Sequence, residues 1–166
     1  MLPNEYRYKF KDFMVKHGLT LAVAESLTGG HVQYLMSSTN GSSNFFVGGV
    51  TAYNIDQKVN ILKVDRKNAE KCNCVSSQTA IEMAQGVQQL MGSDYGLSTT
   101  GYSVKNDSVD EPYAYVALYD KKRDNSEFIK IINRKFTTRE ESQVYFSDQA
   151  MLFFYAYVLV QEGAEK

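Results

Sequence analysis

The chain has 166 residues, of which 43% are hydrophobic and 22% charged, with a formal net charge of −1. This composition is typical of a globular protein and predicts one domain over residues 1–166, long enough to bury a core. The small net charge gives no electrostatic reason to expect nucleic-acid or anionic-membrane binding, and no apolar run approaches the roughly 20 residues that span a bilayer.

The N-terminal segment is too charged for a signal peptide, so a cytoplasmic protein is expected. Apolar periodicity and turn-forming residues then predict helices and strands that alternate along the first two thirds of the chain. In chain order these are helix 4–17, strand 20–24, helix 29–37, strand 45–53, helices 56–62 and 66–71, helix 77–90, strands 95–100, 113–119 and 127–136, and helix 138–161.

Early alternation of strands and helices favours parallel strand pairing, and the two late strands are joined by DKKRDNS, a connection typical of a hairpin. We therefore predict an α/β fold: a three-layer α/β/α sandwich with a mixed, mostly parallel sheet and a late antiparallel hairpin. The long helix 77–90 is expected to place Ile81, Ala84, Val87 and Leu90 on its core face.

A segment rich in hydroxyls and glycines, Ser26-Leu27-Thr28-Gly29-Gly30, joins the first strand to the next helix. Ligands tend to bind at strand ends in α/β sheets, and a helix N-terminus offers free N–H groups to an anion. The same residues are also typical of an ordinary helix cap followed by turn glycines. The segment alone leaves both interpretations open.

A second cluster brings Ser43, Tyr53 and Lys58 within sixteen positions of one another. A serine hydroxyl becomes a good nucleophile when a base removes its proton, and a lysine can be that base when burial lowers its pKa. The alternative is a turn serine, a core tyrosine and a surface lysine.

The two cysteines, Cys72 and Cys74, are separated by one residue, so a disulfide between them would be strained. The two histidines, His17 and His31, lie far away in sequence, which argues against a metal site. Reduced, structural thiols are expected.

Four segments together resemble one family. AESLTGG, GSSNFFVGGVTAYNIDQK, VSSQTAIEMAQGVQQLMGSDYGLSTTG and FTTRE are similar, in this order, to motifs of the CinA C-terminal domain family, which includes the PncC amidohydrolases. The resemblance implies a three-layer sandwich, commonly a homodimer, that hydrolyses the carboxamide of nicotinamide mononucleotide to nicotinic acid mononucleotide and ammonia. It implies no metal and no cofactor, a nucleotide as the partner, and no nucleic-acid or membrane partner.

The resemblance also implies roles for individual residues. The catalytic residues would be Ser43 as nucleophile, with Tyr53 and Lys58. The substrate-binding residues would be Ser26, Thr28, Gly29, Gly30, Thr100, Gly101 and Arg139, the last as a phosphate partner through its fork of donors.

The chain departs from the family pattern after its third predicted strand. The glycine-rich G-I-A-G-P segment of the family is replaced by Gly101-Tyr102-Ser103-Val104-Lys105, and a second late arginine by Gln143. Larger side chains fill space where glycine lets a ligand approach the backbone. Two hypotheses follow: an amidohydrolase acting on nicotinamide mononucleotide, or a weakly active or inactive homologue that binds a nucleotide or a protein partner.

Overall fold

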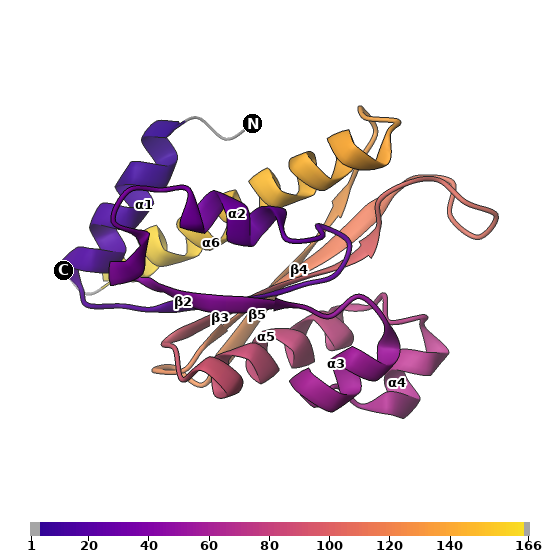
Figure 1. The fold of residues 1–166 in the computed structure, drawn as a ribbon, viewed down its shortest axis with the longest axis horizontal. Coiled ribbons are helices and arrows are strands. Elements are labelled where there is room, and N and C mark those ends of the chain that lie inside the picture. Colours follow the sequence, from indigo (N-terminus) through magenta and orange to yellow (C-terminus); the bar gives the residue numbers. More distant parts are fainter. Residues whose placement is uncertain (1–3, 165–166) are drawn as a thin grey trace.

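The computed structural model describes residues 4–164, which form a five-stranded sheet between two layers of helices (Figure 1). The strands are β1 (Leu21–Glu25), β2 (Phe46–Thr51), β3 (Tyr95–Tyr102), β4 (Tyr113–Asp120) and β5 (Asn125–Ile132). The helices are α1 (Asn4–Lys16), α2 (His31–Ser37), α3 (Ile55–Leu62), α4 (Arg66–Lys71), α5 (Ser77–Met91) and α6 (Arg139–Ala164), with a 3-10 turn η1 (Ser42–Asn44).

The order of strands in the sheet is β2-β1-β3-β4-β5. β1 pairs in parallel with β2 and with β3, whereas β4 is antiparallel to both β3 and β5. The predicted mixed sheet with a late hairpin is therefore confirmed. Because β1, β2 and β3 point the same way, the segments that follow them meet at one edge of the sheet.

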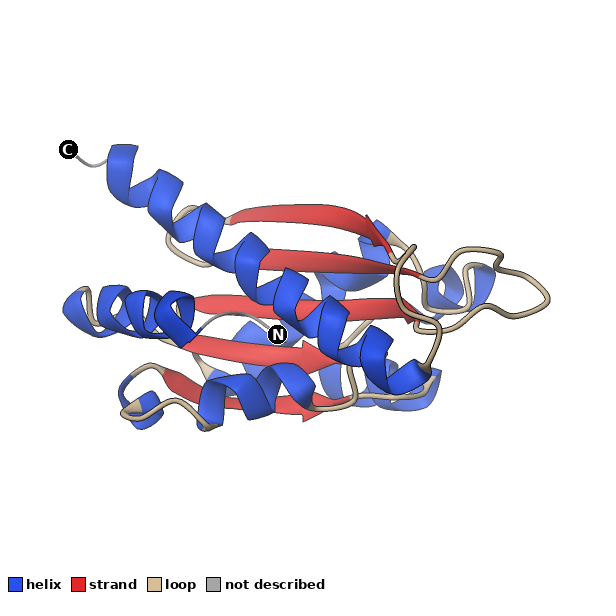
Figure 2. Ribbon diagram, turned by 90° about the horizontal axis from the view of Figure 1, so that it is seen from above, coloured by secondary structure: helices blue, strands red, loops and turns tan. Residues whose placement is uncertain are grey.

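Helices α1, α2 and α6 cover one face of the sheet, and α3, α4 and α5 cover the other (Figure 1). Figure 2 looks onto the first face, where α6 runs obliquely across the strands. The larger core cluster lies under this layer and includes Phe10, Met14, Leu97, Phe146 and Phe154, each at most 1% exposed. No helix within residues 4–164 is long and apolar enough to cross a membrane.

Two glycines let α5 pack directly against its neighbours. A Cβ atom at Gly96 in β3 would lie 2.0 Å from the Ala84 carbonyl oxygen, and one at Gly86 would lie 2.0 Å from the Leu62 carbonyl oxygen. A side chain at either position would force the backbones apart. This close packing holds α3 beside the sheet, where its Lys58 side chain is buried.

The core face of α5 differs in detail from the predicted one. Ala84 and Val87 are fully buried, but Leu90 is 50% exposed. The buried stripe instead follows Ala80, Met83 and Ala84. Leu90 lies seven residues after Met83 and so on the same side of the helix, but it is in the last turn of α5, which ends at Met91.

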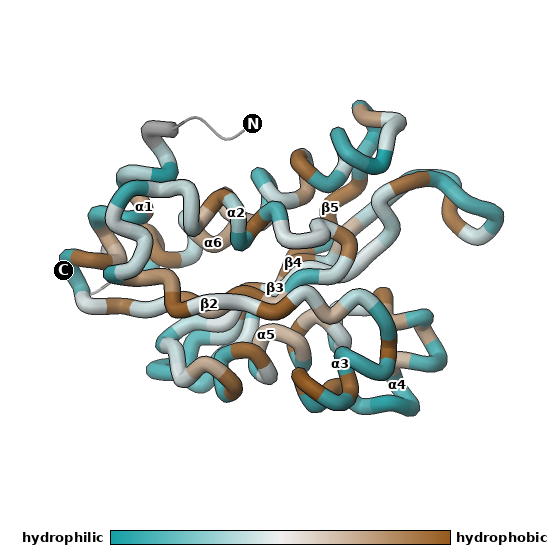
Figure 3. Tube along the Cα trace, viewed as in Figure 1, coloured by the Kyte–Doolittle hydropathy of each residue, from teal (hydrophilic) through white to brown (hydrophobic). Residues whose placement is uncertain are grey.

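The loop between β3 and β4, residues 103–112, projects from the body of the protein (Figure 1) and is mainly hydrophilic (Figure 3). Two contacts connect the two halves of this loop: an isolated antiparallel β-bridge between Asn106 and Val109, and an ion pair of 3.2 Å between Lys105 and Asp110. Glu111 at its end pairs with Arg134 at 2.9 Å. The loop follows the point where the sequence departs from the glycine-rich segment of the family pattern.

Candidate active site

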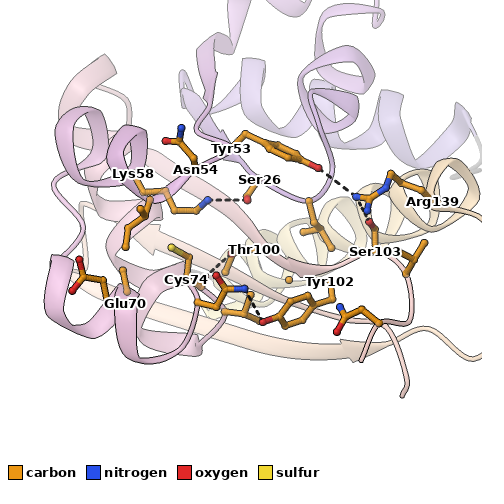
Figure 4. Close-up of a pocket in the computed structure, with 18 residues that line it drawn as sticks. Ser26, Tyr53, Asn54, Lys58, Glu70, Cys74, Thr100, Tyr102, Ser103 and Arg139 are labelled. Atoms are coloured by element: carbon orange, nitrogen blue, oxygen red, sulfur yellow. Dashed lines mark hydrogen bonds between the residues drawn. The ribbon is translucent and has the colours of Figure 1, made fainter. Parts of the chain in front are cut away.

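A cavity of about 620 Å³ opens at the edge of the sheet where the parallel strands end (Figure 4). Such strand ends are common ligand sites in α/β folds, and the volume suits a small molecule. Its lining comes from the segments after β1 and β2, from α3, α4 and the turn between α4 and α5, from the end of β3 and the loop after it, and from the start of α6. The residues are Ser26, Leu27, Tyr53, Asn54, Ile55, Lys58, Ala69, Glu70, Asn73, Cys74, Val75, Thr100, Gly101, Tyr102, Ser103, Val104, Asn106 and Arg139.

A buried lysine and a buried serine meet in the wall of this cavity. Lys58 Nζ lies 2.9 Å from Ser26 Oγ and donates a second hydrogen bond of 2.8 Å to the Ala52 carbonyl oxygen. Lys58 is 2% exposed and Ser26 is 8% exposed. The Asn54 side chain caps α3 by accepting a hydrogen bond from the Gln57 N–H, which fixes the first turn that carries Lys58.

Burial lowers the pKa of the Lys58 ammonium below its ordinary value of 10.5, and the nearby Cys74 side chain opposes this shift. Burial also raises the pKa of the Cys74 thiol, because an apolar environment disfavours the thiolate. A lysine with a lowered pKa is neutral in a larger fraction of molecules at a given pH. Neutral Lys58 can then accept the Ser26 hydroxyl proton.

The structure corrects the expectation for Thr28, Gly29 and Gly30, which do not line the cavity. The Glu25 carboxylate occupies the start of α2, accepting hydrogen bonds from the N–H groups of Gly30, Val32 and Gln33 at 2.8 to 3.1 Å. The Thr28 hydroxyl donates to the same carboxylate at 2.6 Å. The helix start does attract an anion, but that anion is the chain's own side chain.

Ser43 is not brought together with Lys58, which contradicts the expected trio. Ser43 lies in η1 before β2 and is exposed, whereas Tyr53 and Lys58 follow the other end of β2. The six residues of β2 between them span roughly 20 Å of extended chain. The serine that does contact Lys58 is Ser26, a position expected only to bind substrate.

Arg139, the first residue of α6, reaches across the cavity to two hydroxyls. Its Nη1 donates to Ser103 Oγ at 2.9 Å and to the Tyr53 hydroxyl at 3.3 Å. Ser103 is 3% exposed, while Tyr53 is 56% exposed. Tyr53 therefore lies in the same cavity as Lys58, but its hydroxyl contacts the arginine.

Another wall of the cavity comes from β3 and from the turn before α5. Thr100 and Gly101 line it, and the buried Thr100 hydroxyl donates to the Cys74 carbonyl oxygen at 2.7 Å. The Tyr102 hydroxyl accepts a hydrogen bond of 3.2 Å from the Asn73 side chain. Tyr102 thus fills part of the wall where the family pattern has a smaller residue.

Several cavity residues were missed from the sequence, among them Asn73, Cys74 and Ser103. Asn73 and Cys74 both adopt positive φ angles, 48° and 62°, in the turn between α4 and α5. A positive φ angle is uncommon for residues other than glycine, and the sequence gives no local signal for it at these two positions. Cys74 is a free, buried thiol, as predicted, but it lines the cavity as well.

The fold and the cavity place the chain in the class of three-layer α/β/α proteins with a ligand site at the ends of parallel strands. Two solved structures are similar over almost their whole length. Competence damage-inducible protein A from Klebsiella pneumoniae has a TM-score of 0.86 at 20% identity, covering 93% of this chain and 96% of that one. Competence/damage inducible protein CihA from Agrobacterium tumefaciens has a TM-score of 0.84 at 22% identity, covering 94% and 97%. At such identities the likeness establishes the fold alone.

The sequence profile of the CinA C-terminal domain matches residues 4–157, and the chain therefore belongs to this family. A CinA-like protein from Dictyoglomus thermophilum is 40% identical over 111 residues, which are 65% of this chain and 27% of that protein. A CinA-like protein from Synechocystis is 41% identical over 108 residues, 63% of this chain and 26% of that protein. The match thus spans about a quarter of the length of these two curated relatives.

Proposed function

We propose that this chain is an amidohydrolase that removes ammonia from the carboxamide of nicotinamide mononucleotide or a closely related nucleotide. The observation that carries the proposal is the contact of 2.9 Å between Lys58 Nζ and Ser26 Oγ, two buried side chains in the wall of a cavity. A buried lysine beside a serine hydroxyl is a known way to build an activated nucleophile.

In the proposed reaction neutral Lys58 accepts the Ser26 proton while Ser26 Oγ attacks the carboxamide carbon. The tetrahedral intermediate collapses when the C–N bond breaks, and Lys58 returns the proton to the leaving nitrogen, which departs as ammonia. Water then attacks the acyl carbon while Lys58 accepts one of its protons, and Lys58 returns that proton to Ser26 Oγ as the ester C–O bond breaks. The free serine is restored and the acid product ionises to the carboxylate. The Ala52 carbonyl oxygen, which accepts the second Lys58 hydrogen bond, orients the amine throughout.

A nucleotide substrate is supported by the positive charge at the cavity and by the family resemblance. Arg139 contacts only neutral hydroxyls in its two hydrogen bonds, so its charge is available to a phosphate. The cavity volume of about 620 Å³ is within the range typical of sites for small molecules of this size.

A specific observation favours a second candidate, a homologue that binds a nucleotide with little or no turnover. Tyr102 stands in the cavity wall, tied to Asn73 at 3.2 Å, where the family pattern has a smaller residue. A ring fixed in this position narrows the space beside Thr100 and Gly101. Binding of the mononucleotide without ammonia release would favour this candidate.

The direct test is incubation of the purified protein with nicotinamide mononucleotide, with ammonia measured by a coupled dehydrogenase assay. We expect ammonia and nicotinic acid mononucleotide in equal amounts from the wild-type protein. Nicotinamide riboside, which lacks the phosphate, should react more slowly because it cannot use Arg139. Absence of ammonia from the mononucleotide would contradict the proposed activity.

A further inference from the structure

Strand β5 lies at one edge of the sheet, so in the described part of the chain one of its two sides has no neighbouring strand (Figure 2). The Asn133 N–H donates to the Pro112 carbonyl oxygen at 2.8 Å, so the backbone groups of Asn133 face β4. This direction alternates along an antiparallel strand, and every second residue therefore offers its N–H and C=O groups to a further strand. The outward-facing residues of β5 are Ser126, Phe128, Lys130 and Ile132.

The features that usually protect an edge strand from pairing are weak in β5. Its sequence, NSEFIKII, contains no proline. A lysine often protects such an edge, but here the Lys130 Nζ lies over two rings of β4, 4.1 Å from the centroid of Tyr113 and 5.7 Å from that of Tyr115. The ammonium group is thus directed back over β4, and the backbone edge of β5 stays open.

Apolar side chains are exposed beside this edge, on the face of the sheet that α5 covers. The helix packs on β4 through small residues, with Ala80 and Ala84 clustered with Ala117. Phe128, which pairs with Ala117 across the two strands, remains 46% exposed, and Ile132 is 39% exposed. A strand added beside β5 would cover these side chains and bond the open backbone groups at the same time.

A second copy of β5 fits this edge in antiparallel pairing. With Ile129 on the two-fold axis, Phe128 of each chain faces Lys130 of the other, and all outward-facing residues of the strand find partners. An aromatic ring then lies beside an ammonium group on both sides of the axis, which is a favourable pair. An axis at Glu127 or at Lys130 would instead place like charges directly opposite each other.

Charges beyond the strand ends distinguish between the two remaining registers. With Ile129 on the axis, Asp124 in the turn before β5 lies opposite Arg134 of the second copy, and both side chains are exposed. With Phe128 on the axis, Lys122 would lie opposite Arg134, and the two positive charges would repel. The charge pattern therefore favours the register with Ile129 at its centre.

We propose that this chain forms a homodimer in which the two β5 strands pair antiparallel about a two-fold axis at Ile129, so that the two sheets become one. The family resemblance implies a homodimer without saying which surface forms it, and this inference names the surface and the register. It is independent of the proposed reaction, because no residue of β5 lines the cavity.

The test is the oligomeric state of the purified full chain, measured by analytical ultracentrifugation over a concentration series. The wild-type protein should sediment at twice the chain mass of 18.8 kDa. Phe128→Lys places ammonium groups opposite each other on both sides of the axis and should raise the dissociation constant of the dimer at least about tenfold. Val47→Lys is the matched control, since Val47 is 46% exposed on β2, the other edge strand, and this variant should keep the wild-type dissociation constant.

The double variant Phe128→Lys/Lys130→Phe tests the register. It exchanges the ring and the ammonium group, so with Ile129 on the axis the two again face each other, and most of the lost affinity should return. An axis at Phe128 would keep the two new ammonium groups opposite each other and give no recovery. Absence of recovery in a folded double variant would therefore overturn the proposed register.

Amide hydrogen exchange on the wild-type protein is a second measurement that needs no variant. The outward-facing N–H groups of Phe128 and Lys130 should exchange slowly at concentrations where the dimer forms and rapidly on dilution. A wild-type protein that sediments as a monomer, fast exchange of these amides in the dimer, or a dimer that Val47→Lys breaks and Phe128→Lys leaves intact would overturn the proposal.

Discussion

Replacement of Lys58 by methionine is expected to lower kcat for ammonia release by about 10²- to 10⁴-fold, the usual contribution of a general base. Lys58 Nζ is the group that contacts Ser26 Oγ, at 2.9 Å, and without it the hydroxyl keeps its proton. Methionine has a similar unbranched shape and can remain in the buried space of a side chain that is 2% exposed. The measurement is the steady-state rate with saturating nicotinamide mononucleotide.

The matched control is Lys67→Met, which removes an exposed lysine of α4. It should retain the wild-type rate, because Lys67 does not line the cavity. Circular dichroism and denaturant unfolding would show that both variants are folded. A Lys58→Met variant that is folded and turns over within a few-fold of the wild-type rate would exclude Lys58 as the base.

The same assignment fixes the direction of the pH dependence. Protonated Lys58 cannot accept the Ser26 proton, so the rate should fall as the pH drops through the pKa of Lys58 and rise as the pH increases. Because burial lowers this pKa, the rate should level off at a pH below 10.5. The rising limb should disappear in Lys58→Met, where only residual activity remains.

The second large effect concerns stability. Glu25→Ala is expected to lower the free energy of unfolding by about 3–5 kcal/mol, as measured by urea denaturation at pH 7. The Glu25 side chain is fully buried and accepts four hydrogen bonds, one from the Thr28 hydroxyl and three from backbone N–H groups at the start of α2. Alanine would remove the acceptor of the three backbone N–H groups, in part away from water, while the Thr28 hydroxyl keeps its contact of 2.7 Å with Thr99 Oγ1.

Glu141→Ala is the control for Glu25→Ala. Glu141 lies in the first turn of α6 and its carboxylate accepts a hydrogen bond from the Thr138 hydroxyl at 2.8 Å, but it is exposed. Its removal should cost less than about 1 kcal/mol, as is usual for exposed charges. If Glu25→Ala lowers the free energy of unfolding by an equally small amount, the hydrogen bonds of Glu25 do not stabilise the segment that carries Ser26.

The sequence was sufficient to predict the architecture because each main element has a strong local pattern. Apolar strands and turn-rich connections identified the order of helices and strands, and the order in turn predicted the layers. The late strand 127–136 was placed too far along the chain, since β5 ends at Ile132. The end of β5 is set by where its pairing with β4 stops, and the local sequence pattern carries no information about that pairing.

The site was predicted less completely, for a different reason. Resemblance to a motif carries over residue types, but it does not show which side chains meet across the sheet. Ser43 and Lys58 are close in sequence and lie at opposite ends of β2, whereas Ser26 and Lys58 are 32 positions apart and in contact. The glycine-rich turn left a ligand site and an ordinary helix start both open, and only the packing of Glu25 shows that a side chain of the protein itself takes the N–H groups there.

The most direct test of the central claim compares Ser26→Ala with Ser43→Ala in the ammonia assay with nicotinamide mononucleotide. Each variant removes one hydroxyl, from a buried serine in contact with Lys58 in the first case and from an exposed serine before β2 in the second. We predict that Ser26→Ala loses ammonia release to below about 10⁻² of the wild-type rate while Ser43→Ala keeps the wild-type rate. Retained activity in Ser26→Ala, with loss in Ser43→Ala, would contradict the assignment of Ser26 and Lys58 as the reacting pair.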